Sequence, residues 1–261
     1  MSRGGGESNA ADAFTGGDFH SMVLDPNNPG RIFVGGHEAV SVSQDSGRTW
    51  RQIPALKDRD AMGWGFDSET VYVSGHPGLT VSHDGGKTFS ERNQGLPSTD
   101  VHAFGGGGGV LYGASPQAGF FSSPDGGRSW KVVNPNEGRS FFGRILVDPN
   151  NPMRLLAADA AAGVAESIDG GRTFADLGGV SAPTWLSWDP NNPKLLVASG
   201  QQGAARSDDG GRTWSSLDLP TLPAMVEVDP TDPQRLYAGS HDGSNVSLLV
   251  SDDGGVTWRK P

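Results

Sequence analysis

The chain has 261 residues, a formal net charge of −10 at pH 7 and no cysteine. The acidic balance argues against a sequence-independent nucleic-acid binder, which needs a basic surface, and the lack of cysteine excludes disulfides and thiolate metal sites. No apolar run approaches the length of a transmembrane helix. The 40 glycines and 18 prolines fall at regular turn positions, so they indicate many short strands rather than disorder.

The first segment, residues 1–17, lacks the apolar stretch of a signal peptide. We expect it to be a flexible leader. We expect residues 18–261 to form one domain, because a single repeat runs through them without a break.

The longer segment contains one eight-residue motif six times. Its first copy, Ser43–Trp50, reads SQDSGRTW, and its last copy, Ser251–Trp258, reads SDDGGVTW. The central aspartates are Asp45, Asp84, Asp125, Asp169, Asp209 and Asp253, spaced 39, 41, 44, 40 and 44 residues apart. A repeat of this length predicts an architecture built from stacked or radially arranged units.

Each motif has the chemistry of a tight turn between two strands. The aspartate accepts hydrogen bonds from backbone N–H groups just downstream. The glycines supply the positive φ angles that such a turn requires. The closing Trp or Phe begins the next strand and offers a large apolar surface to the core.

Each repeat unit has two further strands before the one that enters the motif. In the first unit, the expected strands Phe19–Leu24 and Arg31–Gly35 are separated by a turn at Asp25–Pro29. Short strands between Gly, Pro, Asn and Asp clusters indicate an all-β fold. We predict a single six-bladed β-propeller with four antiparallel strands in each blade. The blades span about 18–54, 60–93, 100–134, 142–177, 183–218 and 224–260.

The motif S-x-D-x-G-x-T-W resembles the Asp-box, or BNR repeat, of sialidases, sortilin-type receptors and photosystem-assembly propellers. The resemblance implies a propeller with an Asp-box in each C–D hairpin, between the third and fourth strands of a blade. It also implies a structural role for the six aspartates, because the Asp-box of these families lies far from the active face. Similar propellers are usually exported, so it implies an extracytoplasmic protein: secreted, periplasmic or lipid-anchored, with the signal absent from this sequence.

The propeller register places five of the six histidines at the mouth of the central channel, opposite the Asp-boxes. His20, Met62 and His102 align at the inner end of the first strand of a unit, and His37 aligns with His76 after the second strand. Imidazole binds several transition metals, whereas a thioether favours copper(I). The four histidines His20, His37, His76 and His102, together with Met62, therefore predict a transition-metal site in blades 1 to 3, with copper favoured over zinc or manganese.

Carboxylates accompany the histidines. Asp60 and Asp100 are the candidate catalytic groups, either as general bases towards a bound water or as partners that orient the imidazoles. Contacts to a substrate or small polar ligand at the same face are expected from Asp18, Glu38, Asp159 and His241.

A closer resemblance supports one site. Bacterial exported Asp-box proteins that are loosely called glycosyl hydrolases share a His-containing first strand, a Met-Gly strand and a Ser-Gly-His-Pro segment. The matching residues here are His20, Met62-Gly63 and Ser74–Pro77. The resemblance implies that these residues act together and leaves their chemistry open.

The sequence leaves two alternatives to metal binding. One is a glycoside hydrolase-like or metal-dependent enzyme at the channel face, and the other is a platform for a peptide or protein, as in photosystem-assembly propellers. A sialidase is disfavoured, because the arginines Arg48, Arg128, Arg172 and Arg212 lie inside Asp-boxes and cannot form the triad that grips the substrate carboxylate. The sequence does not decide whether the chain is an enzyme, and we expect a monomer without a nucleic-acid partner.

Overall fold

Short strands make up almost all of the regular structure. The computed structural model describes residues 12–222 and 224–261, so residues 1–11 of the expected leader and residue 223 lie outside the described residues. One short 3-10 helix, Pro54–Leu56, interrupts the strands. In the part of the chain that the structure describes, no helix has the length and apolar character needed to cross a membrane. The all-β class predicted from the sequence is confirmed.

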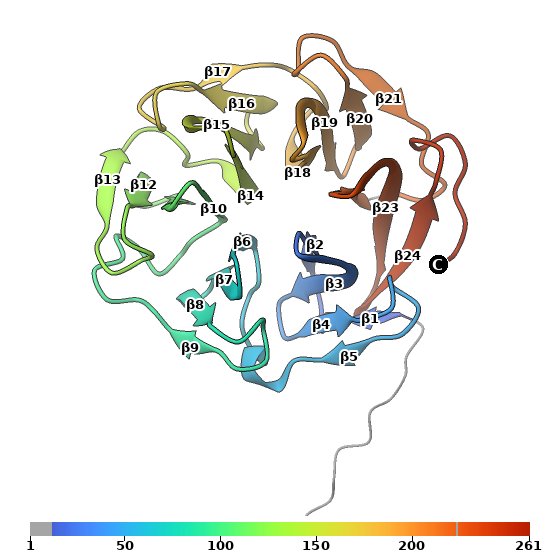
Figure 1. Ribbon diagram of the computed structural model, residues 1–261, viewed down its shortest axis with the longest axis horizontal. Helices are drawn as coiled ribbons and strands as arrows, with labels where there is room; N and C mark the ends of the chain where they lie inside the picture. The colour runs from blue at the N-terminus through green and yellow to red at the C-terminus, as the bar shows by residue number, and fades with distance from the viewer. Residues whose placement is uncertain (1–11, 223) are drawn as a thin grey trace, which may run out of the picture.

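The strands form five hydrogen-bonded sheets around a common centre (Figure 1). Three sheets follow the chain strand by strand. They consist of β2 (Phe19–Asp25), β3 (Asn28–Gly36), β4 (Val40–Ser43) and β5 (Arg51–Gln52); of β6 (Gly63–Asp67), β7 (Thr70–Gly75), β8 (Gly78–Ser82) and β9 (Ser90–Glu91); and of β18 (Pro183–Asp189), β19 (Asn192–Gly200), β20 (Gly203–Ser207) and β21 (Ser215–Leu217).

One sheet has eight strands and contains two of the predicted units, 100–134 and 142–177. It comprises β10 (Ala103–Gly107), β11 (Val110–Ser115), β12 (Gly119–Ser123), β13 (Lys131–Asn134), β14 (Phe141–Asp148), β15 (Asn151–Asp159), β16 (Val164–Ser167) and β17 (Ala175–Asp176). The innermost strands β10 and β14 pair in parallel, Ala103 with Gly143 and Phe104 with Arg144. Glycine permits this approach, because a Cβ atom on Gly105 would lie 1.9 Å from the carbonyl oxygen of Ile145.

The fifth sheet joins the two ends of the chain. It contains β22 (Ala224–Asp229), β23 (Asp232–Asp242), β24 (Asn245–Ser251) and, at its outer edge, β1 (Ala13–Phe14). Thr15 continues the connection, since its carbonyl oxygen accepts bonds from the backbone N–H groups of Glu38 and Ala39 beside the first sheet. Residues 13–15, which lie inside the expected leader 1–17, are therefore part of the ordered fold and tie the last sheet to the first.

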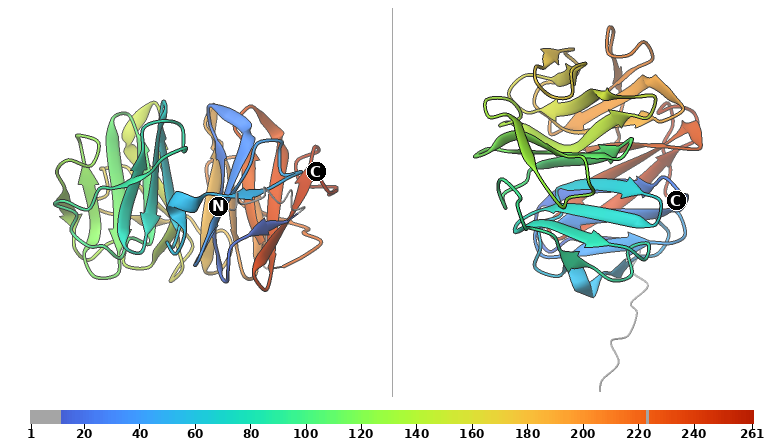
Figure 2. Two further views of the ribbon diagram at one scale, coloured as in Figure 1. Left: turned by 90° about the horizontal axis from the view of Figure 1, so that it is seen from below. Right: turned by 60° about the vertical axis from the view of Figure 1, so that its left-hand side comes forward.

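The first strand of each unit lies nearest the centre, as β2, β6, β14 and β18 show in Figure 1. The strands run between the two faces of the ring (Figure 2). The motif loop and the turn after the first strand lie at the same face, because the N–H of Ser46 donates to the carbonyl of Gly30 at 2.9 Å. The start of each first strand and the end of each second strand therefore meet at the opposite face.

The six motif aspartates hydrogen-bond within their own loops. Asp45 Oδ1 accepts from Ser43 Oγ at 2.8 Å and from the N–H of Thr49 at 2.9 Å, and Asp45 Oδ2 accepts from Thr49 Oγ1 at 2.7 Å. The same three contacts recur at Asp84, Asp125, Asp169, Asp209 and Asp253. Each carboxylate is thereby occupied in bracing its own turn.

Candidate metal centre

Four of the predicted site histidines lie at strand ends of three neighbouring units. His20 is the second residue of β2, and His37 follows β3 directly. His76 follows β7, and His102 precedes β10. Because consecutive strands of a sheet are antiparallel, these strand ends gather at the face opposite the motif loops.

The side chains touch one another in a continuous series. Nε2 of His20 lies 3.3 Å from Nδ1 of His37, which lies 3.1 Å from Oδ1 of Asp60. The other oxygen of Asp60, Oδ2, lies 2.6 Å from Nδ1 of His76. Asp60 thus links a histidine of the first sheet to a histidine of the second.

The series continues into the eight-stranded sheet. Nε2 of His76 is hydrogen-bonded to Oδ1 of Asp100, and Nε2 of His102 lies 2.7 Å from the same oxygen. The other oxygen of Asp100 accepts a bond of 2.7 Å from Nε2 of Gln117. We call the six residues His20, His37, Asp60, His76, Asp100 and His102 the His–Asp chain.

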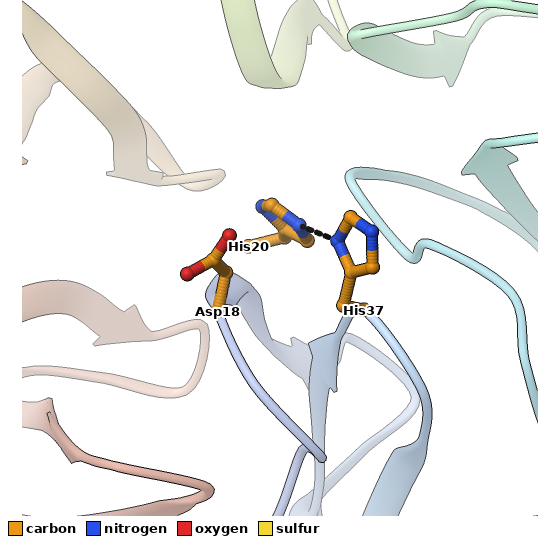
Figure 3. A group of neighbouring side chains, drawn as sticks. All are labelled: Asp18, His20 and His37. Carbon is orange, nitrogen blue, oxygen red and sulfur yellow. Dashed lines mark hydrogen bonds between the residues drawn. The ribbon is translucent and has the colours of Figure 1, made fainter.

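Two groups of potential metal ligands lie at this face, formed by residues of the His–Asp chain together with Asp18. The first group is Asp18, His20 and His37, and the second group is His76, Asp100 and His102. Within each group one ligand atom per residue lies within 4.8 Å of the others. Figure 3 shows the first group, with the rings of His20 and His37 facing each other and the carboxylate of Asp18 beside His20.

A cavity of about 320 Å³ opens at this face between the innermost strands. Asp18, His20 and Met62 border it on one side, and His241 and Gln201 border it on another. Phe142 and Met225 contribute apolar walls. Two residues of the first group, Asp18 and His20, therefore line a pocket that has both polar and apolar walls. Such mixed polarity is usual for a small-ligand site.

Within residues 12–222 and 224–261, no lysine or arginine forms an ion pair with Asp60 or Asp100. Among the described residues, the ion pairs of Asp60 and Asp100 are with histidines. Asp60 has only 8% of its side chain exposed, so its charge lies largely out of water. A buried charge is costly unless it is paired, and among the described residues the ion-pair partners of Asp60 are the imidazoles of His37 and His76.

The titratable groups respond to this setting in different directions. Burial lowers the pKa of His20, against the attraction of Asp60 and Asp18. Burial also acts to lower the pKa of His76, but its hydrogen bonds to Asp60 and Asp100 outweigh burial and raise it. The pKa of Asp100 is lowered although burial opposes this, because His102 and the bonds from His76 and Gln117 favour the carboxylate.

Two predicted ligand-contact residues do not join the site. Asp159 serves its own loop, where Oδ1 accepts from Ser140 Oγ at 2.6 Å and from the N–H of Ala161 at 2.9 Å. The side chain of Glu38 is exposed and lies against Gly16, and Glu38 is not among the residues that line the cavity. By contrast, Asp18, Met62 and His241 line the cavity, and Nε2 of His241 lies 2.6 Å from the carbonyl oxygen of Gly17.

Sequence reasoning missed Gln117 and Phe142. Gln117 holds Asp100, and its own Oε1 accepts from Ser98 Oγ at 2.9 Å. The ring of Phe142 lies 5.0 Å from that of His102, centroid to centroid. Gln117 comes two residues after the end of β11, so it lies in the same loop of its unit as His37 and His76 in theirs, one residue further along.

A second cavity of about 210 Å³ lies deeper along the innermost strands, between the turns of several sheets. Arg144 borders it, and Nη1 of Arg144 lies 3.5 Å from Oε1 of Glu227. Glu227 is 1% exposed, and burial raises the pKa of its carboxyl to about 7, against the opposing charge of Arg144. This pair belongs to the interior of the ring and touches none of the His–Asp chain residues in the contacts described above.

Comparison with known proteins gives the fold and one motif. The model of the BNR/Asp-box repeat matches residues 249–260, the last motif loop. No curated protein matches the chain in sequence.

Several solved structures share the fold. A GH74 xyloglucanase from Xanthomonas campestris has a TM-score of 0.64 at 17% identity, over 95% of this chain and 45% of that chain. YCF48 bound to D1 peptide has a TM-score of 0.58 at 17% identity, over 94% of this chain and 82% of that chain. A nidogen/laminin complex has a TM-score of 0.63 at 14% identity, over 96% of this chain and 92% of that chain.

At these identities the likeness concerns the fold alone. The chain spans less than half of the length of three GH74 structures that share its fold: 45% of one, 46% of another and 33% of a third. In its fold and in its repeated loop, the chain resembles the β-propeller proteins that carry Asp-box, or BNR, repeats.

Proposed function

We propose that this protein binds a transition-metal ion at the first group, Asp18, His20 and His37, with copper as the favoured ion. The observation that carries the proposal is the separation of 3.3 Å between Nε2 of His20 and Nδ1 of His37. Metal–nitrogen bonds of about 2.0–2.1 Å in a tetrahedral site place neighbouring ligand atoms roughly 3.3–3.4 Å apart. The two nitrogens are therefore already spaced as two ligands of one ion.

Charge supports the same reading. The face brings together three carboxylates, those of Asp18, Asp60 and Asp100, with four imidazoles that are largely neutral at pH 7 in isolation. Since lysine and arginine form no ion pair with Asp60 or Asp100 in the described residues, a metal cation is a suitable partner for the excess negative charge.

The choice of copper rests on Met62. Two imidazoles and one carboxylate suit several divalent ions, including zinc, iron and copper(II). The thioether of Met62 borders the same cavity as His20, and thioethers favour copper(I). The general affinity order of nitrogen and oxygen sites also places copper(II) above the other divalent first-row metals.

The position of the group supports an accessible ion rather than a closed structural one. His20 and Asp18 border the cavity of about 320 Å³, so a ligand from solvent can approach. Three protein ligands with an open fourth position characterise catalytic zinc sites, whereas four protein ligands characterise structural ones. Catalysis with Asp60 or Asp100 as a general base, of a glycoside hydrolase-like or other metal-dependent kind, is the alternative at this face.

A peptide-binding platform is the second alternative. It is supported by the fold likeness to YCF48, which was solved with D1 peptide bound. A propeller that holds a peptide at the channel mouth would use the same cavity, with His241 and Gln201 as polar contacts.

The wider setting is also a proposal. We count the eight-stranded sheet as two blades, which gives a six-bladed propeller with an Asp-box loop in each blade, built from about residue 18 onwards and completed by β1. We also propose an extracytoplasmic location, supported by the fold likeness to an extracellular domain and to a bacterial surface component, and a monomeric state.

Metal analysis of the protein without a His tag tests the proposal. The protein is stripped with a chelator, offered Cu²⁺, Zn²⁺ or Mn²⁺, desalted and measured by mass spectrometry of its elements. We expect bound copper in the wild type, a lower copper content in His20→Ala, and no change in His83→Ala, whose histidine lies in an Asp-box loop. A wild type that retains none of the three metals would refute metal binding, provided that it melts cooperatively after the chelator step.

A further inference from the structure

We propose that His76, Asp100 and His102 form a second metal site, so that the channel face holds a pair of ions linked by the carboxylate of Asp60. The sequence pattern pointed to one site built from all the histidines. The structure instead separates the ligands into two groups of two histidines and one aspartate each. This inference rests on the proposed function, because it assumes that the face is built for metal ions.

The convergence of three ligand atoms is the first argument. Nε2 of His102 lies 2.7 Å from Oδ1 of Asp100, and Nε2 of His76 contacts the same oxygen. Both histidines thus direct the same ring nitrogen at one point, next to a carboxylate oxygen. Two imidazoles and a carboxylate converging in this way are a common ligand set for divalent first-row metals.

The hydrogen-bonding capacity of His76 is the second argument. Its Nδ1 faces Oδ2 of Asp60 at 2.6 Å, and its Nε2 faces Asp100. A neutral imidazole has one N–H and can donate to only one of these two carboxylates. The second contact therefore needs a positive charge at Nε2. A second proton on the ring supplies it when no metal is bound, and the proposed metal ion replaces that proton.

The partners behind the ligands are the third argument. Metal-bound histidines usually donate their other N–H to a carboxylate or carbonyl, which fixes the ring. Asp60 does this for His76, and Gln117 holds the second oxygen of Asp100 at 2.7 Å while Ser98 holds Gln117. Two of the three ligands, His76 and Asp100, are thus oriented by hydrogen bonds through atoms that do not face the proposed ion.

Charge leaves room for a second ion. Asp18, Asp60 and Asp100 bring three carboxylates to the face, and one divalent ion offsets only two negative charges. Asp60 lies between His37 and His76, so its carboxylate is next to both groups. Entry of the ion would separate the ligand atoms of the second group to roughly 3.3–3.6 Å, the spacing that tetrahedral metal bonds of about 2.0–2.2 Å impose.

Access favours loading from solvent. The ring of His76 is about half exposed, and Asp100 and His102 are partly exposed. An ion can therefore reach Nε2 of His76 without opening the sheets. The shared carboxylate makes the two sites neighbours, so binding at one is expected to influence affinity at the other.

The number of bound ions tests this inference separately from the proposed function. Chelator-treated protein is titrated with Cu²⁺ and, in parallel, with Zn²⁺, and bound metal is counted per chain after desalting. We expect two ions in the wild type, one in His102→Ala, one in His20→Ala, and none when both substitutions are combined. His83→Ala is the matched control and retains two.

The other outcomes are also decisive. One ion in the wild type that survives His102→Ala but not His20→Ala overturns the second site and leaves the proposed function standing. One ion that is lost with either substitution means a single site spanning both groups, which also overturns the pair. No ion in the wild type removes both proposals. Asp100→Asn, which keeps the shape of the side chain, replaces His102→Ala if that variant fails to melt cooperatively.

Discussion

Oδ2 of Asp60 lies 2.6 Å from Nδ1 of His76, while its other oxygen lies 3.1 Å from Nδ1 of His37. One buried carboxylate is therefore shared by two imidazoles from different sheets. It fixes the orientation of both rings and places its negative charge between the two His/Asp groups.

Asp60→Asn tests this relationship. The substitution keeps the size of the side chain but removes its charge, and an amide nitrogen cannot accept the N–H of a ring. Loss of a partner of this kind typically weakens metal binding by about 10–100-fold. We expect the dissociation constant of the ion at the second group to rise by about that factor, because Asp60 holds Nδ1 of His76, the ring nitrogen that does not face the ion. Competition with a chelator of known affinity measures this constant. An affinity equal to that of the wild type would mean that Asp60 does not organise the ligands.

A substitution at Gln117 separates the two groups. Gln117→Leu removes the donor that holds Oδ2 of Asp100, and Gln117 has no contact with the first group in the bonds described above. We expect weaker binding of the second ion, by up to about 10-fold, with unchanged affinity for the first ion. Calorimetric titration of the chelator-treated protein resolves the two binding events. Equal weakening of both ions would contradict a role confined to Asp100.

Much of the arrangement followed from the sequence because its signals are local. Each Asp-box closes on itself within four residues, as Asp45 does with Thr49, so the motif predicts a turn wherever it occurs. Its spacing then fixed which strand ends share a face, and His20, His37, His76 and His102 do meet there. The register of the strands was enough to predict that these histidines lie at one face.

Three features could not be predicted from the sequence, because they depend on the direction of side chains and on contacts between residues distant in sequence. Asp159 aligned with the site, yet it bonds to Ser140 and braces a loop. The two residues of β1 carry no detectable alternation, and distant contacts order them: the pairing with β24 and the hydrogen bond from Ser41 Oγ to the carbonyl oxygen of Phe14. The division of the histidines into two groups depends on where Asp60 points, which no pattern of residue types records.

The Asp-box carboxylates give the fold a specific acid sensitivity. The hydrogen bonds from Thr173 hold the pKa of Asp169 at about 2, below its ordinary value of 3.8. A group whose folded pKa is depressed stabilises the fold above the unfolded pKa, and that stability is lost as the pH falls through the folded pKa. The same lowering to about 2 occurs at Asp125, Asp209 and Asp253.

We therefore expect the urea midpoint of the wild type to fall between pH 4 and pH 2. Asp169→Asn should lower the midpoint at pH 7 and reduce its further decline in this acid window, because one of the contributing carboxylates is gone. Glu69→Gln, at an exposed side chain of the same face, is the control and should follow the wild type. A midpoint for Asp169→Asn that matches the wild type at pH 7 would show that the loop does not depend on the charge of Asp169.

Glu227 provides a pH dependence of the opposite sign. Burial raises its pKa to about 7 from an ordinary value of 4.5, so the folded protein retains a proton that the unfolded chain releases between these two values. Stability from this group is complete below pH 4.5 and declines as the pH rises towards 7. With 1.36 kcal/mol for each pKa unit, the decline is at most about 3 kcal/mol.

Glu227→Gln isolates this contribution, because glutamine resembles the protonated acid at every pH and still offers an oxygen to Arg144. The unfolding free energy of the variant minus that of the wild type should become more positive between pH 5 and pH 8, whatever its value at pH 5. Urea unfolding of both proteins at several pH values in this range measures the difference, and the subtraction removes the contribution of the histidines. A difference that stays constant with pH would mean that Glu227 remains charged beside Arg144 throughout, and that the interior of the ring tolerates the ion pair without protonation.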